Sequence, residues 1–324
     1  MIIVKAPMRL SFAGGGSDLP GFLERETFGK TLTTTLNKYV YVTINKSSSS
    51  SYRLVYSSIE ECLDPAEIKH VLLRNLLSRH RPKNPVELFS IADLPARGTG
   101  LGASSAFCLA SVAALTKHNG MNLDSSKLAT EASFIEMNMS QNASGYQDQF
   151  ASALGGLSLN TFSITGLVDT ENFLDSKEKH ENYLDWINRH VSFVRVEGAR
   201  DSSSILRGID FNDSVTLSLQ REITDMTVSF ARSITKRNLL EMGELMSLNW
   251  RLKKTLSPEA SNAEVDSMFE LGVRHGAFGG KLLGAGGSGY LVFIVEDSID
   301  FLRRMNLEDT GIRISADKME ILEV

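Results

Sequence analysis

Residues 95–106, Pro-Ala-Arg-Gly-Thr-Gly-Leu-Gly-Ala-Ser-Ser-Ala, place three alternating glycines directly before an apolar run that continues to Leu115. That run predicts a buried helix at about 104–118. Glycines let backbone N–H groups approach a ligand, because no Cβ stands in the way. Serines can cap the helix that begins here, and its first N–H groups carry partial positive charge. The segment therefore predicts a loop that binds phosphate groups at a helix N-terminus.

The serines of this loop also bear on metal binding. Ser104 or Ser105 could give a hydroxyl to Mg²⁺, the usual companion of a nucleotide phosphate. The loop is not a Walker P-loop, which requires Gly-x-x-x-x-Gly-Lys-Ser/Thr. The Gly-Lys-Thr triplet at 29–31 lacks the upstream glycine, because Glu24 stands there. An ordinary glycine-rich turn in front of a core helix is the alternative interpretation of 95–106.

Length and composition narrow the classes of function. The 324 residues are enough for two domains, each with its own core. A net charge of −5 argues against nucleic acid as a partner, so a phosphate site must be built locally. No apolar run approaches the roughly 20 residues of a membrane span, and the first residues resemble a strand more than a signal peptide.

Cysteine and histidine usage points to a reducing compartment. Cys62 and Cys108 do not form a disulfide framework, and Cys108 is expected to be a small core residue of the helix after the loop. The histidines show no metal-ligand spacing. We therefore expect a cytoplasmic protein.

The periodicity predicts a mixed chain of helices and strands. The serine run at 47–51 is expected to be a hairpin loop, and the polar region 163–190 is expected to be irregular, with a domain boundary near 190. Expected strands cover 2–4, 39–44, 52–56, 86–91, 155–159, 191–196 and 290–295, with a last strand pair at the end. Expected helices cover about 67–81, 104–118, 125–139, 213–235, 237–254, 262–275 and 298–305.

A second glycine-containing segment, 7–18, reads Pro-Met-Arg-Leu-Ser-Phe-Ala-Gly-Gly-Gly-Ser-Asp. A strand here ends in three glycines, whose backbone can approach a ligand closely. Arg9 can pair with a phosphate or a developing negative charge, and Asp18 can accept hydrogen bonds from sugar hydroxyls. The alternative is a loop with a surface arginine and a solvated aspartate.

A third segment, 136–149, carries two acidic residues on either side of a turn-prone stretch. Glu136 is expected to end a helix, and Asp148 follows Gly145 in a run rich in amide and small side chains. One carboxylate can orient a phosphoryl acceptor, and a second can hold Mg²⁺. A helix-capping aspartate and an exposed glutamate are the alternative.

A fourth segment, 279–289, satisfies Gly-x-Gly-x-x-Gly at residues 284–289. A dinucleotide-binding fingerprint must follow a strand and open a helix, whereas this segment precedes the strand expected at 290–295. We therefore reject dinucleotide binding, and with it a dehydrogenase. A flexible glycine turn remains, whose backbone could pack against a ligand near an interdomain cleft.

The glycine motifs, in this order, resemble those of the GHMP small-molecule kinases, which include galactokinase, homoserine kinase, mevalonate kinase and sugar 1-kinases. The second motif of that family runs Pro-x-x-x-Gly-Leu-Gly-Ser-Ser-Ala, and this chain has Gly-Leu-Gly-Ala-Ser-Ser-Ala at 100–106, with Pro95 one residue farther upstream. Ser104 falls on the serine that usually binds Mg²⁺. Glu136 matches the acidic metal ligand, and Asp148 matches the catalytic aspartate with one extra residue before it. The resemblance spans nearly the whole chain.

The resemblance implies an α+β fold of two domains with the active site in the cleft between them. Residues 1–190 would form a ribosomal-protein-S5-like nucleotide domain, and residues 191–324 a ferredoxin-like α/β domain. ATP and Mg²⁺ would be the cofactors, with Mg²⁺ on Ser104 and Glu136. Asp148 would face the acceptor hydroxyl, and Arg9 would stabilise charge or grip the substrate. The implied ATP contacts are Arg97, Gly98, Thr99, Gly100, Leu101, Gly102, Ala103, Ser104 and Ser105. The implied substrate contacts are Arg9, Gly14, Gly15, Gly16, Ser17, Asp18, Gly145, Asp148, Gly286 and Gly287.

Within the superfamily, the likeness is greatest to the branch of D-glycero-D-manno-heptose 7-phosphate kinases. Segments 9–18 and 145–149 resemble that branch, although Tyr146 stands where the branch often has Lys, and 249–254 resembles its helix facing the cleft. The likeness implies phosphoryl transfer from ATP to the anomeric hydroxyl of a small sugar phosphate. The product would be the 1,7-bisphosphate, made for nucleotide-activated heptose in bacterial surface polysaccharide. A homodimer stays open.

Two alternatives also stay open. Fucokinase-type domains share much of the pattern, so the acceptor could be an unphosphorylated sugar such as fucose or galactose. A non-catalytic sensor on the same fold would be expected to lack the metal ligand or the aspartate, and both Glu136 and Asp148 are present here.

Trp250 is expected to pack rather than to bind sugar, and at least one of Lys253 and Lys254 is expected to lie on a solvated helix face. A 7-phosphate would need its own cations, for which the candidates are Lys253, Lys254, Lys281, Arg97 and Arg200.

Overall fold

One long strand, β2 (Gly29–Lys46), organises the larger sheet of this computed structural model, which describes the chain except residues 96–97, 141–142, 174–176 and 199–201. Its β-branched and aromatic residues suit a strand. One edge of β2 pairs with β1 (Ile2–Ala13). The other edge pairs with β5 (Val86–Ala92) toward its C-terminal end and with β6 (Leu157–Ser163) toward its N-terminal end. All three pairings are antiparallel, so β2 joins elements from across the first half of the chain.

The predicted hairpin around the serine run is wrong. β3 (Tyr52–Val55) pairs in parallel with β5 and antiparallel with β4 (Ile59–Cys62), and β5 lies between it and β2. The serine hydroxyls of residues 47, 49 and 51 bond to one another. The serine segment between β2 and β3 is therefore not a tight hairpin turn. It connects two strands that are separated in the sheet by β5, a strand from later in the chain.

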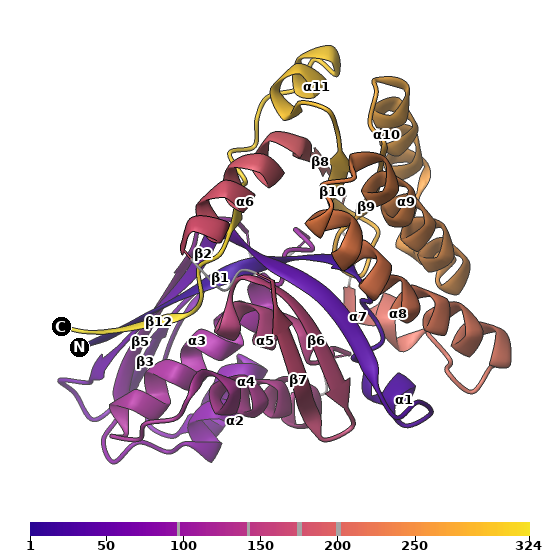
Figure 1. Cartoon of the computed structure of the whole chain (residues 1–324). Coiled ribbons are helices and arrows are strands. Elements are labelled where there is room, and N and C mark those ends of the chain that lie inside the picture. The colour runs from indigo at the N-terminus through magenta and orange to yellow at the C-terminus, as the bar shows by residue number, and fades with distance from the viewer. Residues whose placement is uncertain (96–97, 141–142, 174–176, 199–201) are drawn as a thin grey trace.

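The two ends of the chain lie side by side in the large sheet (Figure 1). β12 (Glu320–Glu323) pairs with β1, and β11 (Ile314–Ser315) pairs with β2. The sequence predicted instead that these last strands pair with each other. The amino group of Met1 donates to the carbonyl of Val324 at 2.8 Å. Residues 314–323 therefore belong to the first sheet, and the division of the chain near residue 190 stays a prediction.

The region 163–190 contains regular structure, contrary to expectation. β7 (Gly166–Asn172) extends the large sheet beside β6, and α6 (Lys177–His190) follows it. β7 is a largely exposed edge strand, which explains its polar sequence. α6 buries Tyr183 and Ile187, which lie four residues apart on one helix face. Because β7 and α6 are largely polar, the spacing of their few apolar residues did not predict a strand or a helix.

A smaller sheet of order β8–β10–β9 forms the second lobe, with helices packed against it (Figure 1). Its strands are β8 (Val191–Val196), β9 (Gly279–Leu282) and β10 (Gly289–Ile294), all antiparallel. Residues 279–282 are thus a strand rather than part of a glycine turn. The helices of this lobe are α7 (Ser202–Arg207), α8 (Ser214–Thr235), α9 (Leu239–Leu256), α10 (Ala263–Arg274) and α11 (Ser298–Arg304).

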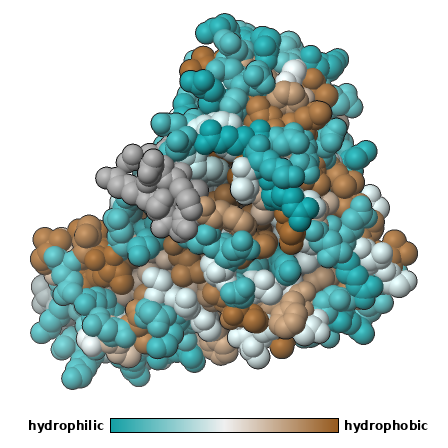
Figure 2. Space-filling view, in the orientation of Figure 1, coloured by the Kyte–Doolittle hydropathy of each residue, from teal (hydrophilic) through white to brown (hydrophobic). Residues whose placement is uncertain are grey.

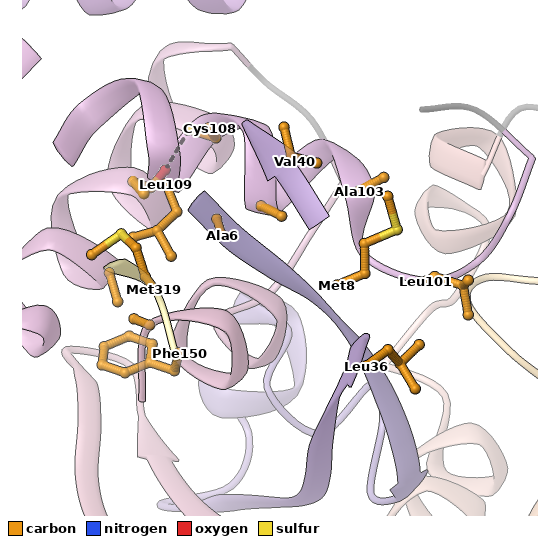
Figure 3. Packing of buried hydrophobic residues seen from close by; sticks show 14 of the residues in the cluster. Ala6, Met8, Leu36, Val40, Leu101, Ala103, Cys108, Leu109, Phe150 and Met319 are labelled. Atoms are coloured by element: carbon orange, nitrogen blue, oxygen red, sulfur yellow. Dashed lines mark hydrogen bonds between the residues drawn. The ribbon is translucent and has the colours of Figure 1, made fainter. Parts of the chain in front are cut away.

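The helix after the glycine loop, α3 (Ala103–His118), runs through the core against β1 and β2. Figure 3 shows Ala103 beside Met8, Cys108 farther along α3, and Leu101 on the loop that precedes the helix. Cys108 is fully buried, which confirms its predicted place in the core. The glycine loop is therefore anchored to the core at its C-terminal end.

Most of the remaining helices flank α3 and the large sheet, whereas the short η3 (Pro258–Ala260) packs against α9. Hydrophilic residues are spread over both lobes on the face seen in Figure 2, and within the described ranges no helix has the length and apolar character of a membrane span. The remaining elements are α1 (Pro20–Leu23), η1 (Pro65–Glu67), α2 (Val71–Arg79), α4 (Ser125–Phe134), the π turn η2 (Ile135–Met139), α5 (Gln147–Leu154) and η3 (Pro258–Ala260).

Candidate functional site

A cavity of about 950 Å³ brings the four glycine and carboxylate segments of the sequence together. Its walls come from the end of β1, the loop 98–105, the start of α5 and, from the second lobe, α9 and the 281–285 segment. This volume suits a small-molecule ligand. The predicted site residues that line it are Arg9, Gly15, Gly16, Asp18, Gly98, Thr99, Gly100, Gly102, Ala103, Ser104, Ser105, Glu136, Gly145 and Asp148.

Five predicted residues do not line the cavity: Gly14, Ser17, Leu101, Gly286 and Gly287. Ser17 is buried, and its hydroxyl donates to the carbonyls of Gly14 and Lys30, both at 2.8 Å. Leu101 lies in the core, and the N–H of Gly287 donates to Ala260 at 2.7 Å. These residues support the loops around the cavity from behind. Arg97 lies outside the described residues.

The glycine loop meets a second glycine segment at van der Waals distance. A Cβ on Gly100 would lie 2.4 Å from the carbonyl oxygen of Leu283, and one on Gly284 would lie 2.5 Å from the Cα of Gly100. Both glycines also have positive φ angles, 71° and 74°. Only glycine fits at this contact, so the segment from the second lobe holds the loop in place.

The N-terminus of α3 opens into the cavity without a side-chain cap. The cap position is Gly102, with φ +75°, and no side chain caps the helix. The serines therefore do not cap α3, contrary to the expectation from sequence; they lie in its first turn. Ser104 is exposed and Ser105 is buried. The first N–H groups of the helix remain available to an anion.

Arg9 connects three parts of the site. Its backbone N–H donates to Leu101 at 2.9 Å, and its Nη1 donates to the carbonyl of Gly100 at 2.6 Å. Its Nε and Nη2 donate to the two carboxylate oxygens of Asp148 at 2.6 and 2.7 Å. A bulge in β1 between Pro7 and Arg9 shifts the strand register here. Strand, glycine loop and carboxylate are thus fixed relative to one another by one buried guanidinium.

Glu136 lies in a π turn at the end of α4 and is buried. Its Oε1 accepts from Ser104 Oγ at 3.3 Å, and its Oε2 accepts from Gln149 Nε2 at 2.7 Å. Burial raises the pKa of Glu136 to about 7, and the charge of Asp148 adds to the rise. A cation beside this carboxylate would offset that burial.

The donor set at Glu136 fits Mg²⁺ bound together with a phosphate ligand. The described residues contain no cluster of three or more His, Cys, Asp or Glu side chains that could hold a metal by itself. Mg²⁺ is commonly held by one or two protein oxygens, with phosphates and water completing the shell. The hydroxyl of Ser104 and the carboxylate of Glu136 supply such a pair.

Asp18 is a second buried carboxylate near Asp148. It accepts hydrogen bonds from the backbone N–H groups of Gly16 at 3.2 Å and Gln147 at 2.9 Å. Burial raises its pKa to about 6, and repulsion from Asp148 contributes. A Cβ on Gly145 would lie 2.0 Å from Asp18 Oδ2, so this contact requires a glycine.

Three polar atoms that the sequence did not single out also lie at this cavity. Ser11 Oγ, Ser144 Oγ and Gln147 Oε1 are buried and have no hydrogen-bond partner in the described part of the chain. Buried polar atoms are normally paired, so these three are suited to bind a polar ligand. Gln147 precedes Asp148 in the first turn of α5, and that position is the signal that could have identified it.

The candidate cations of the second lobe separate into two groups. Lys253 and Lys281 line the cavity, whereas Lys254 pairs with Asp266 at 2.9 Å, as expected for a solvated helix face. Trp250 is 1% exposed, which confirms that it packs in the core. Arg200, like Arg97, lies outside the described residues.

Comparison with known proteins agrees with this geometry. The family model for the N-terminal domain of GHMP kinases matches residues 67–156, and the model for the C-terminal domain matches residues 230–309. Together these ranges span just over half of the chain. A D-glycero-alpha-D-manno-heptose 7-phosphate kinase of Campylobacter jejuni is 24% identical over 91% of this chain and 89% of its own length.

A second relative is similar in sequence, and a solved structure is similar in fold. A bifunctional fucokinase/GDP-fucose pyrophosphorylase of Arabidopsis thaliana is 25% identical over 91% of this chain and 30% of its own length. The crystal structure of a D-glycero-D-manno-heptose 1-phosphate kinase from Bacteroides thetaiotaomicron superimposes with a TM-score of 0.78 at 21% identity, over 100% of this chain and 99% of that one. The two-domain α+β architecture expected from the sequence is confirmed. The chain belongs to the GHMP kinases and is an ATP-dependent phosphotransferase.

Proposed function

We propose that this protein is a sugar-phosphate 1-kinase. It transfers the γ-phosphoryl group of ATP to the anomeric hydroxyl of D-glycero-D-manno-heptose 7-phosphate and releases the 1,7-bisphosphate. The observation that carries the proposal is the carboxylate of Asp148, held by Arg9 against the glycine loop inside one cavity. The similarity to a heptose 7-phosphate kinase supports this acceptor. The reaction would serve nucleotide-activated heptose synthesis for bacterial surface polysaccharide, in the cytoplasm.

The donor side is the loop and the first turn of α3. Backbone N–H groups of 98–105, together with the open helix N-terminus, would hold the ATP phosphates, and Arg97 belongs to this proposed set. Ser104 and Glu136 would hold Mg²⁺, which when bound neutralises charge on the phosphates. Gln149 keeps the carboxylate of Glu136 oriented toward Ser104.

The acceptor side is the wall formed by Asp148, Asp18 and the loop 14–16. Phosphoryl transfer depends mostly on positioning and charge neutralisation, so we assign to Asp148 the orientation of the anomeric hydroxyl. Arg9 holds Asp148 and the glycine loop in fixed positions relative to each other, and in this proposal it also stabilises charge or contacts the substrate. In this proposal Gly14, Ser17, Gly286 and Gly287 shape the loops that contact the substrate.

A sugar would satisfy the unpartnered polar atoms at this wall. Ser11, Ser144 and Gln147 each present a buried oxygen without a partner among the described residues. Asp18 has carboxylate capacity left after its two backbone bonds. A polyhydroxylated acceptor supplies hydroxyl donors and acceptors at several carbons, which fits this set better than an apolar acceptor does.

A 1-kinase for an unphosphorylated sugar is the second candidate, because the fucokinase relative is as similar in sequence identity as the heptose kinase relative. Release of ADP with Mg-ATP separates the two when heptose 7-phosphate, the same heptose without phosphate, and fucose are supplied in parallel. We expect turnover that strongly favours the phosphorylated heptose. Equal turnover of both heptoses, or turnover with fucose alone, would contradict the proposal.

Replacing the carboxylate at the reacting centre tests its role. We expect Asp148→Asn to lower turnover by roughly 10²-fold or more, because the carboxylate that orients the acceptor hydroxyl is lost, while the Kd of a non-hydrolysable ATP analogue changes little. The measurement is steady-state ADP release together with calorimetric nucleotide binding. Asp225→Asn, on the exposed face of α8, is the matched control and should match wild type. Near wild-type turnover in Asp148→Asn would remove Asp148 from this role.

Asp18 predicts a pH dependence of stability. In the folded state the carboxyl group of Asp18 keeps its proton up to about pH 6, whereas in the unfolded chain it loses the proton near pH 4. Between these two pH values the folded state therefore binds more protons than the unfolded state. The free energy of unfolding contributed by Asp18 therefore falls as pH rises from 4 to 6, by about 3 kcal/mol at most. Urea unfolding of wild type and Asp18→Asn should give curves whose separation changes across that window. Parallel curves would show that Asp18 titrates normally.

A further inference from the structure

Two lysines on the wall contributed by the second lobe, one buried and one half-buried, have no role in the steps above. Lys281 lies on β9, is 6% exposed, and donates to the carbonyl of Phe12 at 3.1 Å and to Asn249 Oδ1 at 3.5 Å. Lys253, partly buried, donates to the carbonyl of Gly284. Asn249 and Lys253 are four residues apart on α9, so both lie on one helix face. All three residues line the cavity.

These ammonium groups lack a counter-charge. Within the part of the chain that the structure describes, neither lysine has a carboxylate within ion-pair distance, and the nearby Asp148 is already paired with Arg9. Burial lowers the pKa of Lys253 to about 7, and repulsion from Arg9 adds to it. Burial also lowers the pKa of Lys281, with repulsion from Lys253 and Arg9. Buried cations are costly unless they are paired, so an anion in the cavity would stabilise this arrangement.

The position of Lys281 favours the acceptor over the nucleotide as the source of that anion, whereas Lys253 binds Gly284, which packs against Gly100 of the glycine loop. The nucleotide phosphates already have the N–H groups of 98–105 and the N-terminus of α3. Lys281, in contrast, contacts Phe12, which lies just before the glycine segment 14–16 and Asp18, where we place the sugar. Lys254 points away to Asp266 and cannot contribute.

We propose that Lys253 and Lys281, together with Asn249, form the subsite that binds the phosphate of the sugar-phosphate acceptor. This inference rests on the proposed sugar-phosphate kinase function and names the residues that recognise its substrate class. Two ammonium groups can make charge-assisted hydrogen bonds to a phosphate dianion. Binding energy from this remote phosphate would then be used to position the anomeric hydroxyl at Asp148.

Substrate preference in charge-removing variants tests the subsite. We expect Lys253→Met and Lys281→Met each to lower the ratio of kcat/KM for heptose 7-phosphate to kcat/KM for the unphosphorylated heptose by about 10- to 100-fold. Lys254→Met, on the same helix, should leave the ratio unchanged. Calorimetric binding of a non-hydrolysable ATP analogue and of ADP tests the donor side in the same proteins.

The outcomes separate the inference from the function on which it rests. A wild type that uses both heptoses equally contradicts the proposed function itself. A wild type that prefers the phosphate, with lysine variants that keep the preference, contradicts only the subsite. Variants that weaken the ATP analogue but not ADP would also overturn it, because the lysines would then act on the transferred phosphoryl group.

A second variant keeps the test decisive if the methionine variants fold poorly. Asn249→Asp places a carboxylate 3.5 Å or so from the Lys281 ammonium, where the substrate phosphate would otherwise supply the negative charge. We expect this variant to have a higher Tm than wild type and a weaker preference for the phosphorylated sugar. Unchanged preference together with a raised Tm would contradict the subsite.

A further measurement supplies the wild type with the unphosphorylated heptose and a separate phosphate-like dianion in place of the sugar phosphate. Phosphite, a small dianion, should activate turnover of the unphosphorylated heptose by filling the empty subsite, as expected when a remote group supplies binding energy. The activation should be lost in Lys281→Met and kept in Lys254→Met. Absence of activation in wild type would contradict the subsite.

Discussion

The ion pair between the buried Arg9 and the half-buried Asp148 is the interaction on which the site depends. One guanidinium ties a strand of the large sheet, the glycine loop and the first turn of α5 together. Removing Asp148 would leave the Arg9 guanidinium buried without a counter-charge, which costs more than the net gain of the pair. The loop and the carboxylate cannot move independently, so donor and acceptor are positioned by the same contact.

Around this pair, acidic and basic groups occupy separate walls of one cavity. Glu136 and Asp18 have raised pKa values, because both are buried and both face Asp148. Lys253 and Lys281 have lowered pKa values, because they are buried near Arg9. A bound ligand of opposite charge would stabilise the charged form of the side chains on each wall. That ligand is a cation at Glu136 and an anion at the two lysines. Such opposed shifts are typical of sites built for charged ligands.

Sequence patterns predicted the parts of the site that are local. The phosphate-binding role of the glycine loop was predicted from its own short stretch of sequence, whereas the roles expected for Glu136 and Asp148 depended on the resemblance to the family. Long-range strand pairings could not be predicted from sequence patterns. The pairing of β3 with β5, and of the last strand with β1, depends on how segments distant in the sequence pack together. Lys253 and Lys254 are adjacent in sequence, and the 100° turn of a helix alone decides which one reaches the cavity.

Phosphorus NMR of the reaction with ATP and D-glycero-D-manno-heptose 7-phosphate tests most directly whether Asp148 faces an anomeric hydroxyl. We predict a new sugar phosphate resonance whose phosphorus couples to the anomeric proton, while the phosphate already at position 7 stays in place. A new phosphate on any other carbon, or release of inorganic phosphate with the sugar unchanged, would contradict the assignment of Asp148 and of the 1-kinase reaction.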